Sequence, residues 1–336
     1  MKKNILIFTV LIFLVCVINT CFASENKKKL AQTGFQFLSV ISDAEAAAMA
    51  GAVNSLEMGS RSLFFNPAGL AGINYRTEVT ASFNEWIADI NHMTFSAAIN
   101  LTPRTGSLGI FGVTVQSVDY GEILETMVAN NEKGYEDIGV FSPTAYSIGL
   151  GYARMLSDRF SVGGQIKFVH QDMGESFVPI SGDSVSEKRS YDLSPMSYDF
   201  GTLFKTGFKS LTFGMSVRHF SKEIKYVEEG FQLPLLFTLG ISMNVLDFVE
   251  ASEKNHSLIV SLDATHDRSY PEQLLIGINY TLMKTLSLRT GYITGDDEEG
   301  FSFGCGISKF GLELNYGYTP FGVFDNIQRM TAVFKF

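Results

Sequence analysis

The chain has 336 residues, and its 26 basic and 35 acidic residues give a formal net charge of −9 at pH 7. This acidic balance argues against nucleic-acid binding. Aromatic residues are abundant, with 29 Phe and 13 Tyr, and the mean hydropathy is +0.13, yet no apolar run after the N-terminus is long enough for a membrane-spanning helix. A hydrophobic composition without a hydrophobic helix is typical of a transmembrane β-barrel.

Residues 1–23 predict a secretory signal peptide. Lys2 and Lys3 form a basic start, residues 5–17 are apolar, and Ala23 provides a small residue at a cleavage point. An uncleaved membrane anchor is the alternative, but the apolar run is short for it. We therefore expect an exported protein whose signal peptide is cleaved.

Cleavage after residue 23 would leave 24 basic and 35 acidic residues, so the net charge would become −11. It would also remove two of the three cysteines and leave Cys305 alone, which excludes an intramolecular disulfide framework. Cys21 raises the alternative of a lipoprotein. Asn19 and Thr20 do not match the small residues that a lipidation signal requires.

Residues 24–75 predict a plug or hatch segment. Residues 42–53, SDAEAAAMAGAV, predict a short helix, because Ser42 and Glu45 have the spacing of a capping box and Ala is the best helix former. Nearly all of these side chains are small, so the helix can approach other main chain closely, which suits a segment enclosed by a barrel. The alternative is a poorly packed export leader.

A rigid turn follows within SRSLFFNPAGLAGINY, residues 60–75. Pro67 fixes its own φ and directs Asn66 towards an extended conformation, and Gly69 tolerates a positive φ. The two Phe residues before the turn and the Leu after it need an enclosing surface. The predicted plug and gate residues are Ser42, Glu45, Phe64, Phe65, Asn66, Pro67, Gly69 and Leu70.

Residues 76–336 predict the barrel itself, because apolar and polar residues alternate with a period of two. In the last segment, RMTAVFKF, one face carries Met330, Ala332, Phe334 and Phe336. The predicted fold is therefore all-β, a transmembrane antiparallel barrel of about 14 strands with a short N-terminal helical plug. The candidate strands are 76–86, 91–101, 105–119, 143–155, 158–170, 195–205, 208–220, 232–246, 255–266, 272–282, 285–294, 299–308, 310–319 and 326–336.

The connections between these segments alternate between short and long. The short ones are 102–106, 156–158, 206–209, 283–285 and 308–310, and the long ones are 120–142, 171–194, 221–231 and 294–300. Outer-membrane barrels have short periplasmic turns and longer extracellular loops, so this alternation predicts such a barrel with both termini in the periplasm. Residues 247–255 depart from the alternation. A soluble β-sandwich or propeller is the alternative, but it does not need apolar strand faces so consistently.

The last residue and the size of the barrel each support a further prediction. Phe336 is an aromatic end to an alternating segment, which predicts recognition by the outer-membrane assembly machinery, although a buried closing strand would end in the same way. A barrel of about eight strands fills itself with side chains, whereas a larger one leaves room for a plug. We therefore expect the barrel wall to enclose Phe64, Phe65 and the turn.

Two motifs carry a resemblance to a known family. The first is FLSVISDAEAAAMAGAVNSLEMGSRSLFFNPAGLAGI with its NPAGL turn, and the second is YARMLSDRFSVGG at residues 152–164. With these motifs the chain resembles the PorV/PorQ family, which is similar in turn to long-chain fatty-acid transporter (FadL-like) barrels. The resemblance spans nearly the whole chain after residue 23 and implies a 14-stranded barrel with an N-terminal plug. Glu45 and Met49 depart from the Gly or Arg of many relatives.

The polar residues show no pattern of enzymatic chemistry. The five His residues are scattered, without an H-E-x-x-H motif or a Cys/His cluster, so we expect no enzyme activity, no metal site and no cofactor. The acidic run from Asp296 to Glu299 raises the alternative of a Ca²⁺ site. It lacks the spacing of a known calcium loop, and a solvated or lipopolysaccharide-facing turn is the simpler interpretation.

Two functions from different classes remain open. The predicted function is passage of hydrophobic small molecules, such as lipids or fatty acids, across the bacterial outer membrane when ligand displaces the plug. The alternative, implied by the PorV-like branch of the resemblance, is a non-conducting barrel associated with type IX secretion that holds export partners or cargo at the cell surface. The first requires an apolar pocket leading to the plug or an opening in the wall, and the second requires a closed lumen and a loop surface. Expected partners are outer-membrane lipid, a hydrophobic ligand or a secretion-system protein, and the assembly machinery.

Overall fold

The computed structural model describes residues 33–102, 108–179, 186–226, 229–248, 255–296 and 299–336. The predicted signal peptide, residues 1–23, lies outside the described residues, as do residues 24–32 of the predicted plug segment and residues 297–298 of the acidic run.

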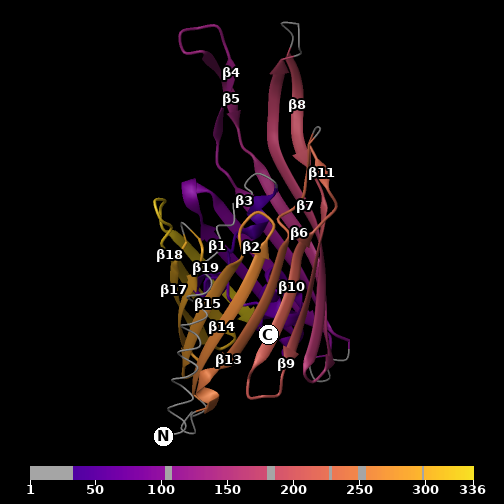
Figure 1. The fold of residues 1–336 in the computed structure, drawn as a ribbon, viewed down its shortest axis with the longest axis vertical. Coiled ribbons are helices and arrows are strands. Elements are labelled where there is room, and N and C mark those ends of the chain that lie inside the picture. Colours follow the sequence, from indigo (N-terminus) through magenta and orange to yellow (C-terminus); the bar gives the residue numbers. More distant parts are fainter. Residues whose placement is uncertain (1–32, 103–107, 180–185, 227–228, 249–254, 297–298) are drawn as a thin grey trace.

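Fourteen strands of the described chain close into one antiparallel barrel, which confirms the predicted fold class (Figure 1). They are β1 (Thr77–Glu85), β2 (Asn91–Asn100), β3 (Ile110–Asp119), β6 (Thr144–Ser157), β7 (Phe160–Pro179), β9 (Met196–Lys205), β10 (Thr212–Phe220), β13 (Leu236–Asn244), β14 (His256–Asp267), β15 (Gln273–Leu282), β16 (Leu286–Ile293), β17 (Phe301–Lys309), β18 (Leu312–Thr319) and β19 (Ile327–Lys335). β1 pairs with β2 on one side and with β19 on the other, so the first and last strands close the sheet.

Side chains alternate across the wall, with polar groups inside and apolar groups outside. On β1, Thr80, Ser82 and Asn84 are buried in the interior, whereas Phe83 between them is 42% exposed. β2 and β3 repeat this alternation along their lengths. A polar interior with an apolar exterior is the arrangement of a transmembrane barrel, because the exterior meets lipid.

The long connections gather at one end of the barrel and carry strands of their own. β4 (Ile123–Val128) and β5 (Tyr135–Phe141) form a hairpin, and the far part of β7 pairs with β8 (Ser186–Leu193). Figure 1 shows both standing above the barrel wall. A short ladder of β11 (Ile224–Lys225) and β12 (Gly230–Phe231) lies in the next long connection. The sequence predicts only loops here, because a hairpin such as β4–β5, exposed on both faces, has no buried side to impose a period of two.

The segment before β1 consists of short helical turns. They are η1 (Gln36–Ser39), α2 (Ala44–Ala48), η2 (Gly59–Phe64) and η3 (Pro67–Gly72), while η4 (Ile87–Asp89) and η5 (Val245–Phe248) lie in connections between strands. Helices in the described ranges are all too short or too polar to cross a membrane.

The helix predicted over residues 42–53 is shorter than expected, because α2 has only 5 residues. Asp43 is its N-cap, with the carboxylate accepting a hydrogen bond from the Ala46 nitrogen at 2.8 Å. The capping box predicted for Ser42 and Glu45 is therefore wrong, since a neighbouring carboxylate takes the capping position. α2 ends where the next residues turn back with positive φ angles.

Glycines on the inner face of the wall make room for the main chain of residues 33–75. A Cβ at Gly317 of β18 would lie 2.7 Å from the Ala44 oxygen, and a Cβ at Gly214 of β10 would lie 2.8 Å from the Ser55 Cα atom. Separations this short do not occur for real Cβ atoms. These strand positions therefore accept only glycine, and the described part of the N-terminal segment is packed against the wall as a plug.

Candidate functional site: the plug and its anchors in the barrel wall

The turn predicted at Asn66 and Pro67 anchors the plug. Pro67 begins η3, and the Asn66 side chain caps it, with Oδ1 accepting a hydrogen bond from the Ala68 nitrogen at 3.1 Å. The same amide donates through Nδ2 to the Asn54 oxygen at 2.8 Å and to the Thr202 oxygen of β9 at 3.1 Å. Asn66 thus satisfies a helix end and ties the turn to both plug and wall.

Gly69 is needed for a different reason than predicted. It is not among the described glycines with a positive φ. A Cβ at this position would lie 2.7 Å from the Ser62 Oγ atom and 2.8 Å from the Leu56 oxygen. The turn therefore requires glycine because η2 and η3 pack closely together.

The aromatic residues before the turn lie in the interior of the plug. Phe65 is buried in a cluster with Met49, Val53 and Met58, and Phe64 is half-buried at the edge of that cluster. The cluster joins α2, η2 and the segment between them. It therefore holds the helical turns of the plug together from inside.

A second cluster joins the plug to the wall. Leu63 and Leu70 pack against Ala98 of β2, Ile110 of β3 and Ala153 of β6, and all five side chains are buried. The small side chains of Ala98 and Ala153 leave space for the two leucines, so an apolar contact forms on an otherwise polar inner surface.

Arg218 of β10 contacts the turn from the wall. Its guanidinium donates to the Phe64 oxygen and lies 5.8 Å from the centre of the Phe65 ring, within the range of a cation–π contact. Nearby, the Lys167 ammonium of β7 forms an ion pair with Asp199 of β9 at 2.6 Å. The wall facing the aromatic residues is therefore charged and hydrogen-bonded.

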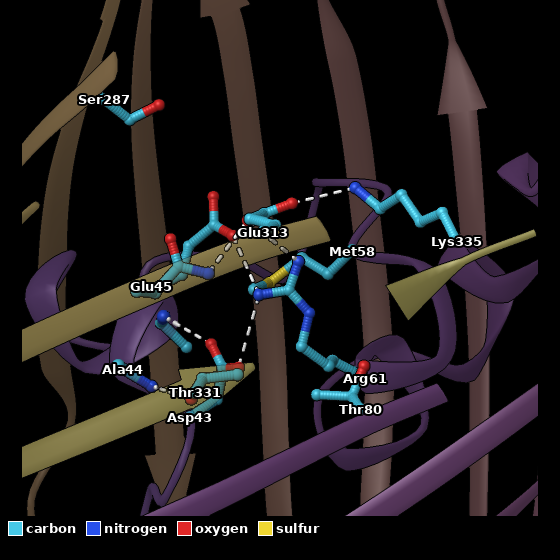
Figure 2. A network of polar contacts seen from close by, with 12 residues as sticks. Asp43, Ala44, Glu45, Met58, Arg61, Thr80, Ser287, Glu313, Thr331 and Lys335 are labelled. Carbon is cyan, nitrogen blue, oxygen red and sulfur yellow. Dashed lines mark hydrogen bonds and ion pairs between the residues drawn. The ribbon is translucent and has the colours of Figure 1, made fainter. Parts of the chain in front are cut away.

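Arg61 of η2 is the centre of a buried ion-pair network, shown in Figure 2. Its Nη1 atom lies 3.3 Å from Asp43 Oδ2 and 2.9 Å from Glu45 Oε2, and its Nη2 atom lies 3.7 Å from Glu313 Oε1 of β18. The Arg61 side chain is only 5% exposed. The guanidinium therefore links two parts of the plug to the wall.

Charged residues of the wall complete the network. Arg289 of β16 lies 3.0 Å from Glu45 and donates to Asn315 Oδ1 at 2.7 Å. The Lys335 ammonium of β19 lies 2.8 Å from Glu313 Oε2, whereas Arg61 lies near the other carboxylate oxygen, Oε1 (Figure 2). Two strands of the wall, β16 and β18, therefore form ion pairs with the plug, and β19 supplies a cation that pairs with Glu313.

The plug–wall network consists of Asp43, Glu45, Arg61, Arg289, Glu313 and Lys335. Its three cations and three carboxylates balance. Removing charges from water is unfavourable, and removal of one partner of such a buried set leaves an uncompensated charge. The network thus makes the seated position of the plug specific, since a shifted plug would separate these pairs.

The plug main chain is also anchored near α2. The Ala44 nitrogen donates to Thr331 Oγ1 at 2.9 Å, and Arg329 Nε donates to the Ile41 oxygen at 2.8 Å. Both wall residues belong to β19. Ser42 between these anchors is buried, and its Oγ atom has no hydrogen-bond partner among the described residues.

Two cavities lie on opposite sides of the plug. At the end with the long connections, Trp86, Tyr270 and Phe321 line a cavity of about 530 Å³ together with charged residues. At the other end, Lys205 and Lys284 are among the residues that line a cavity of about 430 Å³. No described residue lines both cavities. The plug therefore lies between them as a partition.

A small void is present within this partition. It has a volume of about 30 Å³ and is lined by Asp43, Phe65, Gln116, Lys167 and other residues. On the same measure a cavity needs about 10–15 Å³ to hold one water molecule, so the void has room for a few water molecules at most. The void is therefore too small for a hydrocarbon ligand.

Phe336 extends the pairing that closes the barrel. Its nitrogen donates to the Thr77 oxygen at 2.8 Å, and its oxygen accepts from the Thr77 nitrogen at 3.1 Å. Its side chain is 73% exposed. The recognition of this residue by the assembly machinery stays a prediction.

The structure places most of the predicted plug residues in the plug interior. The charged wall residues that contact the plug were not predicted from the sequence. Arg289 and Glu313 are the only charged residues of β16 and β18, and each stands at an inward position. A lone charge at such a position is the signal that sequence reasoning missed. Among the described residues, no group of His, Cys, Asp or Glu is arranged to hold a metal ion.

The family of the chain follows from its sequence. A family model described as type IX secretion system protein PorV matches residues 23–255. The chain belongs to the PorV family. The match includes the plug and the strands through β13, and it confirms the predicted resemblance. No curated protein matches the PorV-family chain.

The fold of this PorV-family protein is similar to that of hydrocarbon transporters. The toluene transporter TodX of Pseudomonas putida has a TM-score of 0.56 and 13% identity, with 91% of this chain and 98% of that chain covered. The CymD monoaromatic hydrocarbon channel has a TM-score of 0.55 and 10% identity, with 87% and 97% covered. A FadL homologue of Pseudomonas aeruginosa has a TM-score of 0.53 and 12% identity, with 88% and 98% covered. At these identities the similarity establishes the fold, a FadL-like outer-membrane barrel.

Proposed function

We propose that this PorV-family barrel is closed to solutes and holds a type IX secretion partner or cargo protein at the cell surface. The observation that carries the proposal is the partition between the two cavities. Plug main chain packs against wall glycines, and the plug–wall network forms ion pairs between the plug and strands β16 and β18. A route for solutes would require these buried charges to separate, which is unfavourable without a compensating partner. Type IX secretion is the process that the family description names.

We assign partner capture to the β4–β5 hairpin. The hairpin stands above the barrel in Figure 1 and exposes apolar side chains, with Leu124 66%, Val128 90% and Val140 55% exposed. An isolated two-stranded hairpin is only marginally stable in water, and its open edges can pair with a strand of another protein. A bound partner would cover both the apolar side chains and the open edges.

The experiment replaces residues 122–142 with a short Gly-Ser linker in a host that has a type IX secretion system. We expect the amount of barrel in the outer membrane to stay the same, because the hairpin contributes nothing to the wall, and we expect surface attachment of cargo to be lost. A milder variant changes Leu124, Val128 and Val140 to Ser and keeps the hairpin. Unchanged cargo attachment in both variants would rule out the assignment.

A second candidate function is passage of hydrophobic small molecules. It is favoured by the aromatic residues Trp86, Tyr270 and Phe321 in the cavity of about 530 Å³ and by the fold shared with hydrocarbon channels. Conductance and fatty-acid binding of the refolded protein test it, with a variant lacking residues 31–75 as the opened control. If neither protein binds or conducts, this function fails, whereas a conducting wild type would overturn the closed barrel.

The proposal includes export and excludes catalysis. We propose that residues 1–23 are cleaved during export to the outer membrane, which N-terminal sequencing of the purified protein tests by finding Ser24 first. The proposed role needs binding alone, so no enzymatic step is assigned to any residue.

A further inference from the structure

The lipid-facing side of the barrel carries a groove where β1 meets β19. We call it the seam groove. It has a volume of about 790 Å³. One row of paired outward residues runs along it, one from each of β3, β2, β1, β19, β18 and β17, and consists of Val115, Phe95, Ala81, Ala332, Leu314 and Ile307.

Two alanines form the floor of the seam groove. Ala81 and Ala332 are direct partners across the seam, so two short side chains lie next to each other. One step along the same strands, Phe83 and Met330 are also direct partners, and they are 42% and 59% exposed. The pairing register therefore places a low floor beside a raised apolar edge.

The shape of the seam groove fits an extended chain. Six neighbouring strands at about 4.8 Å spacing span roughly 24 Å. Its outward lining is apolar apart from Ser117, Cys305 and the Tyr316 hydroxyl, and it lies in the band of the wall that meets lipid. Elongation and an almost purely apolar lining suit hydrocarbon rather than a polar or compact ligand.

We propose that the seam groove holds one acyl chain of an outer-membrane lipid in a fixed position. The occupant is hydrocarbon because the groove opens directly into the lipid-facing band, so a lipid chain reaches it without crossing water. This inference does not depend on the secretion role proposed above, because it concerns the outer face of the wall.

The inner face of the same two strands gives the bound chain a structural role. Thr331, next to Ala332, accepts from the Ala44 nitrogen at 2.9 Å and shares a hydrogen bond with Ser82, next to Ala81, also at 2.9 Å. The main chain that forms the floor of the seam groove therefore also carries a plug anchor. A seated acyl chain would pack against the wall at the point where the plug is held.

The test uses the full protein in vesicles of phosphatidylethanolamine, a small fraction of which carries a photoreactive diazirine on an acyl chain. After irradiation, peptide mass spectrometry maps the adducts. We expect them to concentrate on β1 and β19 and to saturate as the labelled fraction rises. Ala81→Leu with Ala332→Leu fills the groove and should remove this enrichment. Ala264→Leu, an exposed outward alanine on β14, is the matched control and should leave it unchanged.

A second measurement does not need the photoreactive group. Native mass spectrometry of the detergent-solubilised protein should show one retained lipid that the filled variant loses and the Ala264→Leu variant keeps. Heat-modified migration in gel electrophoresis checks that each variant is a folded barrel, which we expect because Leu faces lipid at all three positions. Adducts spread evenly around the wall, adducts unaffected by filling, or a dimer that filling dissociates would each overturn the proposal, the last by placing a second copy in the groove.

Discussion

Gly163 of β7 packs against the main chain of Pro67: a Cβ at position 163 would lie 2.5 Å from the Pro67 carbonyl oxygen. Pro67 belongs to the first sequence motif that carries the family resemblance, and Gly163 belongs to the second. The two motifs are thus the two sides of one contact. The fixed φ of Pro67 keeps the turn rigid, so the wall must supply the space.

We expect Gly163→Ala to lower the free energy of unfolding by about 1–3 kcal/mol, the range for overpacking, because the added methyl group meets main chain that cannot rotate away. Urea unfolding of the refolded protein in detergent, followed by Trp86 emission, measures it. Gly164→Ala is the control. Its Cβ would face outward with the Asp199 oxygen at 3.4 Å as the nearest contact, so little change is expected. Equal losses in the two variants would contradict the close approach.

The plug–wall network predicts a large effect of removing its central cation. Arg61→Ala leaves Asp43 and Glu45 buried beside each other, so we expect a loss of about 3–5 kcal/mol in the free energy of unfolding. We also expect single-channel conductance to appear or increase as the plug loosens. Lys205→Ala is the control, because its ion pair with Glu57 is 2.7 Å long but 42% and 35% exposed, and such pairs contribute about 0–1 kcal/mol. A stable, non-conducting Arg61→Ala protein would argue against the network as the element that holds the plug.

The two functions of the Asn66 amide can be separated by substitution. Asn66→Asp keeps an oxygen that accepts from the Ala68 nitrogen but loses the donor to the Asn54 and Thr202 oxygens. Asn66→Ala loses both. We expect loss of the accepted bond, and separately loss of the donated bonds, each to lower the free energy of unfolding by about 1–3 kcal/mol. Asn66→Ala should therefore be the less stable variant. The rate at which a protease cleaves the plug segment provides a second measurement. Equal stability of Asn66→Asp and wild type would show that the hydrogen bonds donated by Asn66 contribute nothing.

Leu63 and Gly151 of β6 are in contact, so we expect a smaller side chain at position 63 to make room for a larger one at position 151. Leu63 is fully buried, and a Cβ at Gly151 would overlap its methyl groups. We expect Leu63→Ala to lower the free energy of unfolding by about 2–5 kcal/mol. We expect Gly151→Ala to be tolerated better in that background than in the wild type, a coupling that a double-mutant cycle measures. Leu150→Ala, with a 63% exposed lipid-facing side chain, is the control for loss of leucine alone.

The barrel was largely predictable from the sequence because lipid imposes a period of two on every wall strand. Met330, Ala332 and Phe334 share the outer face of β19 as the alternation predicts. The β4–β5 hairpin was not predictable in the same way, because water on both faces imposes no alternation. Its side chains Leu124 and Val128 stand on an exposed ladder that resembles a loop in sequence.

The contacts of the plug were only partly predictable. The turn at Asn66 and Pro67 follows from local rules, since a proline limits both itself and its neighbour. The ion pair between Arg61 and Glu313 joins residues 252 positions apart, and no local rule relates them. The sequence does show that a carboxylate at an inward position between Leu312 and Leu314 needs a partner, but it does not identify that partner.

Glycines along the inner wall also have a consequence for assembly order. Their clearance is so small that the helical turns of the plug could not be threaded into a finished cylinder from either end. Because β1 and β19 are the first and last wall strands in the chain, their pairing is the step with the longest loop to close. We therefore expect the plug to be in place before β1 and β19 pair, so that it is built into the barrel during folding rather than inserted afterwards.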